Sequence, residues 1–148
     1  MSDSQSNLRT FRYDEISVGE RHQRDYVITV ETRRNFLLAF EDHSPVHVDE
    51  AFARSQGFEG CVMHGAILNG FTSNFVGMYF PGRFSLLLTV DLRFSNVSYL
   101  NDSIRIEAIV SQKMDARRVV VLDLAFSNLT RNWTAARGRA QVMIKEQD

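Results

Sequence analysis

The sequence predicts an α+β domain in which a curved antiparallel sheet wraps around one long central helix. Two observations lead to this prediction: an apolar helical stretch from His64 to Tyr79, and long alternating segments after it. A helix that is apolar over much of its circumference belongs in a core. Alternating segments joined by short turns form antiparallel strands, and their apolar face needs a cover. The long helix is the one large candidate for that cover.

The first half of the chain predicts one strand and two short helices. Residues 26–30 alternate between apolar and polar side chains, which indicates a strand. Residues 32–40 have helical periodicity, and Thr32 is expected to cap this helix. A second short helix is expected over residues 49–56, with Asp49 as its N-cap.

The second half changes to a period of two, which is typical of strands. The expected strands cover residues 84–95, 103–110, 120–126 and 136–144. On the first of them, Leu86, Leu88 and Val90 are expected to share the apolar face. A curved antiparallel sheet around one buried helix is the hot-dog arrangement. Its exposed edge favours assembly into a homodimer or a higher homo-oligomer.

Length and composition fit one globular domain. The chain has 148 residues, and we expect a flexible tail over 1–10 and a single domain over 11–148. The net charge is −1, from 17 basic and 18 acidic residues, so nothing drives binding to nucleic acid or to an anionic membrane. Cys61 is the lone cysteine and cannot form an internal disulfide. The polar N-terminus has no signal-peptide core and no apolar run would cross a bilayer, so a cytoplasmic location without membrane insertion is expected.

The most informative motif lies between the short helices. Asp42 and His47 stand five residues apart across Pro45, in a loop where a tight turn brings both side chains onto one water molecule. His64-Gly65 then begins the long helix. The free backbone N–H groups at a helix start, and the missing Cβ of glycine, suit a carbonyl oxygen that becomes negative during a reaction.

These residues resemble the MaoC-like, (R)-specific enoyl-CoA hydratases. The signature of that family reads approximately S-G-D-x-N-P-[hydrophobic]-H-x-D, then G-F, then H-G at the start of the central helix. The matching positions are Asp42, Pro45, His47, Asp49, Gly57, Phe58, His64 and Gly65. Two departures, Phe40-Glu41 in place of Ser-Gly and Ser44 in place of Asn, concern the identity of the substrate more than the type of reaction.

The resemblance implies a hydro-lyase that reversibly hydrates a trans-2-enoyl thioester to the (R)-3-hydroxyacyl thioester. Asp42 and His47 would be the catalytic residues, and Gly65 would supply the oxyanion site. The substrate-binding residues would be Ser73, which matches a helix serine that lines the site in relatives, together with His64 and Ser44. The partner would be an acyl-CoA or an acyl-carrier-protein thioester, and the resemblance implies no cofactor. A metal site is not expected, since Pro45 separates His43 from His47 and no third ligand follows.

Other interpretations of the same residues remain. Taken singly, Asp42 fits a turn aspartate and His47 a half-buried structural histidine. Asp49 fits a helix cap better than a catalyst. At the level of function, the alternatives are a hot-dog acyl-CoA thioesterase and a non-catalytic module that binds an acyl group.

Overall fold

The computed structural model describes residues 8–146. Its elements are η2 Tyr13–Glu15, β1 Arg21–Val27, α1 Val30–Phe40, α2 Pro45–Val48, α3 Glu50–Ser55, α4 Ala66–Asn74, the π-helical turn η3 Phe75–Tyr79, β2 Ser85–Phe94, β3 Ser103–Met114, η4 Asp115–Arg117, β4 Val119–Asn128 and β5 Trp133–Ile144. The five strands form one sheet in the order β1-β3-β4-β5-β2, and every pair of neighbours is antiparallel. β2 thus pairs with β5 and not with β3, its neighbour in sequence.

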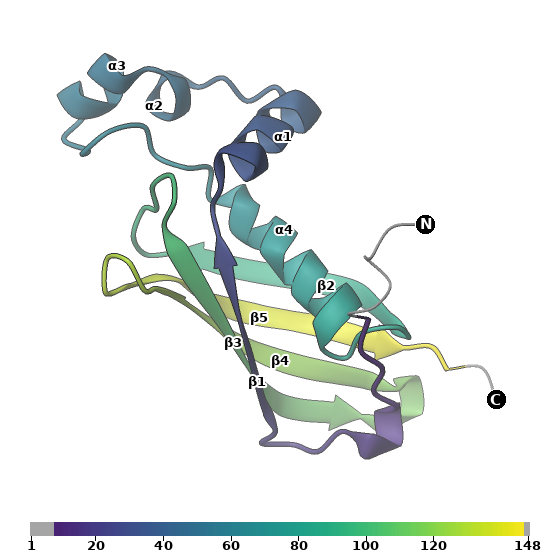
Figure 1. The fold of residues 1–148 in the computed structure, drawn as a ribbon. Helices are drawn as coiled ribbons and strands as arrows, with labels where there is room; N and C mark the ends of the chain where they lie inside the picture. Colours follow the sequence, from purple (N-terminus) through teal and green to yellow (C-terminus); the bar gives the residue numbers. More distant parts are fainter. Residues whose placement is uncertain (1–7, 147–148) are drawn as a thin grey trace.

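The arrangement in space confirms the predicted hot-dog fold. Helix α4 runs across one face of the curved sheet, while α1, α2 and α3 gather beyond one end of α4 (Figure 1). Among the described residues, no helix is long and apolar enough to cross a membrane.

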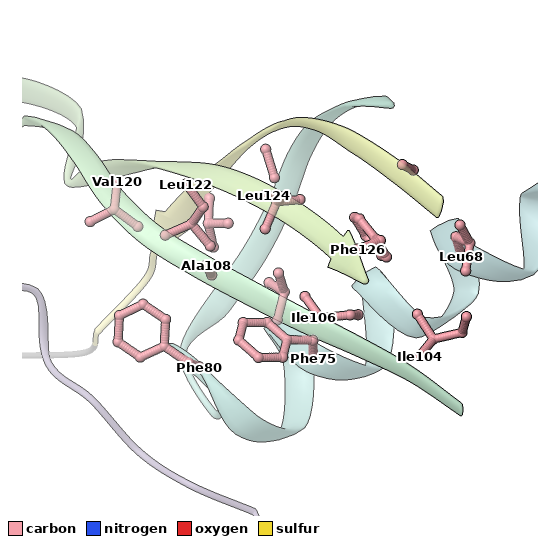
Figure 2. Close-up of a cluster of buried hydrophobic side chains, with 14 of the residues drawn as sticks. Leu68, Phe75, Phe80, Ile104, Ile106, Ala108, Val120, Leu122, Leu124 and Phe126 are labelled. Carbon is pink, nitrogen blue, oxygen red and sulfur yellow. The ribbon is translucent and has the colours of Figure 1, made fainter. Parts of the chain in front are cut away.

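The core lies between α4 and the sheet. Phe75 and Phe80 point from the helical side toward Ile106, Leu122 and Phe126 of β3 and β4 (Figure 2), and all five are fully buried. The predicted alternation explains this face, since every second residue of β3 from Ile104 to Val110 is buried. Burial of these side chains supplies most of the hydrophobic stabilisation.

Strand β2 departs from the predicted alternation. A register shift between Leu87 and Thr89 reverses the faces within the strand. Leu87 and Val90 therefore pack against the core, while Leu86 and Leu88 stay 48% and 42% exposed. The prediction that Leu86, Leu88 and Val90 share one face was wrong, because a bulge inserts one residue that a strict period of two does not contain.

The first strand and helix also begin earlier than predicted. The strand expected over 26–30 is β1, which ends at Val27, and α1 already begins at Val30. Thr29 caps α1, since its hydroxyl oxygen accepts the backbone N–H of Thr32; Thr32 is not the cap. The predicted cap of the next helix is confirmed, because the Asp49 carboxylate accepts the backbone N–H of Phe52 at 3.0 Å.

Helix α4 is not buried on all sides. Ile67, Leu68 and Thr72 are buried, but Gly70 and Ser73 are exposed on the side that faces away from the sheet. The expectation of a helix with an apolar surface nearly all round was wrong on this side. The side chains on this side are small or polar, so they leave open space beside α4.

Part of the predicted tail lies outside the described residues, namely 1–7. Two residues of the rest are bound to η3 and to the turn after it: Arg9 donates its backbone N–H to the Met78 carbonyl, and Thr10 forms a β-bridge with Gly82.

Candidate active site

Asp42 follows directly after α1. Glu41 ends this helix in the left-handed conformation, with φ of 52°, and so turns the chain sharply. The backbone N–H of Ser44 donates to the Asp42 carboxylate at 3.2 Å. The side chain of Asp42 is half exposed, so its second oxygen stays available to a ligand.

His47 lies in α2, a helical turn where the sequence predicts a loop. Its Nδ1 is 2.7 Å from the carbonyl oxygen of Val62. A carbonyl only accepts, so Nδ1 carries a hydrogen, and Nε2 is the ring nitrogen that points to a ligand. Arg33 of α1 donates from Nη2 to the backbone carbonyl of His47 at 3.1 Å. His47 is therefore held both through its ring and through its backbone carbonyl.

The predicted convergence of Asp42 and His47 is confirmed. One oxygen or nitrogen atom from each of Asp42, His47 and His64 lies within 4.8 Å of the other two. Such a spacing lets one water molecule contact more than one of them, and a metal ion would also fit the distances. Nε2 of His64, however, already donates to the backbone carbonyl of Asp42 at 2.9 Å. The groups left to hold a small ligand are the Asp42 carboxylate and Nε2 of His47.

His64 connects the two predicted catalytic residues. Only 3% of it is exposed, and its ring stacks on that of His47 with centroids 3.9 Å apart. Burial lowers the pKa of His64 below its ordinary value, which keeps the ring neutral. Because Nε2 donates, Nδ1 carries no hydrogen, and it has no partner among the described residues. The ring thus fixes the Asp42 carbonyl without adding charge.

Gly65 lies at the start of α4, where the oxyanion site is expected. Within the described chain no protein acceptor takes its backbone N–H. A Cβ built on Gly65 would lie 3.2 Å from the ring of Phe94, so a larger residue would have to displace that ring. Together with His47 and His64, Gly65 and Phe94 line a cavity of about 280 Å³, which we call the Phe94 cavity. Its position suits a carbonyl oxygen at the helix start.

The side chains of two other predicted residues form no hydrogen bond with this centre among the described residues. Ser44 is exposed at the N-cap of α2 and makes no side-chain capping bond. Ser73 is exposed on α4, about two turns beyond Gly65, and does not line the Phe94 cavity.

Sequence reasoning missed Arg33 and Phe94. Arg33 has no local signal, because its partner is a backbone carbonyl fourteen residues away. Phe94 lies near the end of the strand expected over 84–95 and carries no signal of a site; it is half exposed, and its ring is close to Gly65.

Fold and site together define a hot-dog protein that carries an aspartate and a histidine beside the start of its central helix. The chain belongs to the family of the MaoC like domain, whose model matches residues 15–128. This confirms the resemblance seen in the motif.

The chain is also similar in sequence to two named enzymes. An (R)-specific enoyl-CoA hydratase from Aeromonas caviae is 30% identical over 87 residues, which cover 59% of this chain and 65% of that protein. A mitochondrial 3-hydroxyacyl-[acyl-carrier-protein] dehydratase from Arabidopsis thaliana is 26% identical over 89 residues, which cover 60% of this chain and 52% of that protein. The matches therefore span less than two thirds of either relative.

The fold is that of a solved hydratase. The unliganded R-hydratase PhaJ1 from Pseudomonas aeruginosa superposes with a TM-score of 0.85 at 24% identity, over 95% of this chain and 89% of that one.

Proposed function

We propose that the protein is a hydro-lyase that reversibly adds water to a trans-2-enoyl thioester and forms the (R)-3-hydroxyacyl thioester. The observation that supports this most is the approach of Asp42 and His47 to each other. His47 also lines one cavity with Gly65, whose backbone N–H has no acceptor among the described residues. The hydratase and dehydratase relatives support the same reaction in its two directions.

In the proposed mechanism, Asp42 and Nε2 of His47 hold one water molecule. As the water oxygen bonds to C3 of the enoyl group, one water proton passes to this pair and electron density moves onto the thioester oxygen. The backbone N–H of Gly65 stabilises that oxygen at the positive end of the α4 dipole. A proton from the pair then adds to C2, which completes the addition of water. The reverse sequence removes water.

The carrier of the acyl group is proposed to be coenzyme A or a carrier protein. The Aeromonas relative is named for a CoA thioester and the Arabidopsis relative for a carrier-protein thioester. Both carriers present the same phosphopantetheine arm to an active site. We propose the cytoplasm as the place of the reaction.

We also propose that the protein works as a homodimer. β2 is a ten-residue edge strand, and the exposed Leu86 and Leu88 lie on it. A long apolar edge of this kind favours pairing with a second chain. Light scattering at micromolar concentration should give twice the chain mass; a monomer would contradict the proposal.

The reaction is tested with the purified protein and a panel of trans-2-enoyl-CoAs. We expect the absorbance of the enoyl group to fall and chiral analysis to find the (R)-3-hydroxy product. Release of free thiol without loss of enoyl absorbance would indicate the thioesterase alternative. No change with an enoyl-CoA of any chain length would favour the acyl-binding module.

A further inference from the structure

A second and larger cavity lies on the exposed side of α4. It is an open groove of about 720 Å³ between α1 and α4, which we call the α1–α4 groove. Its lining residues are Thr32, Asn35, Phe36 and Phe40 of α1 and Ala66, Ile67, Asn69, Gly70 and Phe71 of α4. Pockets for small molecules have this size and this mainly apolar lining, with a few polar groups.

The groove adjoins the candidate catalytic centre. Phe36 lines the groove and also lies against His64, with ring centroids 4.4 Å apart, and His64 stacks on His47. Ala66, at the near end of the groove, follows Gly65 in the chain. A ligand in the groove would therefore begin beside the helix start, where the proposed thioester carbonyl is bound.

The two cavities differ in chemistry. Beside its apolar side chains, the Phe94 cavity contains the polar residues Ser95, Asn96 and Ser98, whereas aromatic and aliphatic side chains dominate the α1–α4 groove. A thioester also has two unlike arms. Its thiol arm carries amides that need hydrogen-bond partners, and its acyl arm is a hydrocarbon that gains free energy from leaving water.

The groove also leaves apolar side chains exposed to water, which is unfavourable in free energy. Phe40 lines the groove and is 69% exposed, and its ring lies against that of Phe36, with centroids 4.8 Å apart. A large exposed aromatic side chain beside an apolar groove is typical of a binding site.

We propose that the α1–α4 groove binds the acyl chain of the thioester, and that the protein prefers chains longer than the four carbons of a crotonyl group. This inference rests on the proposed function for the identity of the ligand. The thiol arm then passes through the Phe94 cavity, and the carbonyl lies between the two at Gly65. Phe40 stands at the position where the family signature has serine, so an aromatic wall here is a feature of this chain.

Two glycines of the same helical segment provide a matched test. Apart from the backbone of the helix itself and the adjacent residues, a Cβ at Gly70, in the groove, or at Gly77, outside it, would meet no atom within 4 Å. Neither Gly70→Leu nor Gly77→Leu should therefore disturb the core, but only Gly70→Leu places a bulky side chain in the groove. Circular dichroism and thermal melting check that both variants fold.

The measurement is calorimetric binding of butyryl-CoA and decanoyl-CoA, which needs no turnover. Each buried methylene contributes about fourfold in affinity, so the wild-type protein and Gly77→Leu should bind decanoyl-CoA more than about tenfold more tightly than butyryl-CoA. In Gly70→Leu this ratio should fall to within about threefold.

Three results would overturn the proposal. They are equal affinity of the wild-type protein for both chain lengths, an unchanged ratio in Gly70→Leu, and a monomer in Gly70→Leu where the wild-type protein is a dimer, which would assign the groove to a second copy. A chain-length ratio without hydration of any enoyl-CoA would refute the proposed function and keep the groove assignment.

Discussion

The sheet with α4 and the segment from α1 to the start of α4 are stabilised in different ways. The inner face of β3 presents four consecutive inward side chains, Ile104 to Val110, that are fully buried. By contrast, α1 and α2 contain no buried residue, and α3 contains only Ala53. Hydrogen bonds to backbone carbonyls hold this second region, including those from Arg33, His47 and His64. The comparison teaches that stability and the candidate chemistry reside in separate parts of the molecule.

Removing the His47 imidazole should have the largest effect on activity. His47→Ala should lower kcat for enoyl-CoA hydration about 10²–10⁴-fold, the usual contribution of a positioned acid or base. Asp42→Asn combined with His47→Ala should be barely worse than either single variant, because both groups act on one water molecule. Steady-state kinetics check this, and multiplicative losses in the double variant would contradict a shared water.

The free energy of unfolding should depend more on the sheet than on α1. Ile106→Ala removes a fully buried side chain from β3 and should lower the free energy of unfolding by about 2–5 kcal/mol. Leu38→Ala on α1, where leucine is 69% exposed, should change it by less than about 0.5 kcal/mol. Urea titration measures both. Equal losses would show that the two regions do not differ as described.

Substitution of His64 should lower kcat, because His64 donates a hydrogen bond to the backbone carbonyl of Asp42. The amide nitrogen of glutamine reaches about as far as Nε2, so His64→Gln can still donate to the Asp42 carbonyl, whereas His64→Leu cannot. We expect His64→Leu to lose about 10–100-fold in kcat from misplacement of Asp42, and His64→Gln to lose much less. Equal losses would indicate that the hydrogen bond does not position Asp42.

The pH dependence of the free energy of unfolding tests whether His64 is neutral in the folded protein. Burial lowers the pKa of His64 in the folded protein, so the unfolded chain takes up this proton at higher pH. The free energy of unfolding should therefore fall as the pH drops below about 6.5, the ordinary histidine value, until the lower folded pKa is reached. This decline should be smaller in His64→Gln. An identical decline would contradict a neutral, buried His64.

A small gain in the free energy of unfolding is expected from a change at the end of α1. Glu41 has a φ of 52°, a conformation that costs a non-glycine residue about 1 kcal/mol and that glycine adopts freely. Glu41→Gly, which restores the family residue, should raise the free energy of unfolding by about 0.5–1 kcal/mol. Glu41→Ala is the control and should not stabilise, since alanine keeps the Cβ. Chemical denaturation measures the free energy of unfolding of both variants, and a loss in Glu41→Gly would contradict the expectation.

The same contrast explains what the sequence could predict. Strands β3, β4 and β5 were placed nearly correctly, because over much of their length one buried face determines which residues are apolar. The bulge between Leu87 and Thr89 has no such signal, since all of residues 86–88 are leucine. Around the site, the spacing of Asp42, His47 and Gly65 predicted their approach. The contact of Phe94 with Gly65 joins elements far apart in the chain, which local patterns do not encode.

The central claim is that Asp42 acts on the water and does not hold the fold or the ligand. Asp42→Asn is nearly isosteric and can still accept the backbone N–H of Ser44, so the protein should melt at the wild-type temperature and bind butyryl-CoA with unchanged affinity. Its kcat for crotonyl-CoA hydration should nevertheless fall about 10²–10⁴-fold, equivalent to about 3–5 kcal/mol of activation free energy. Wild-type turnover in a folded Asp42→Asn protein would contradict the account.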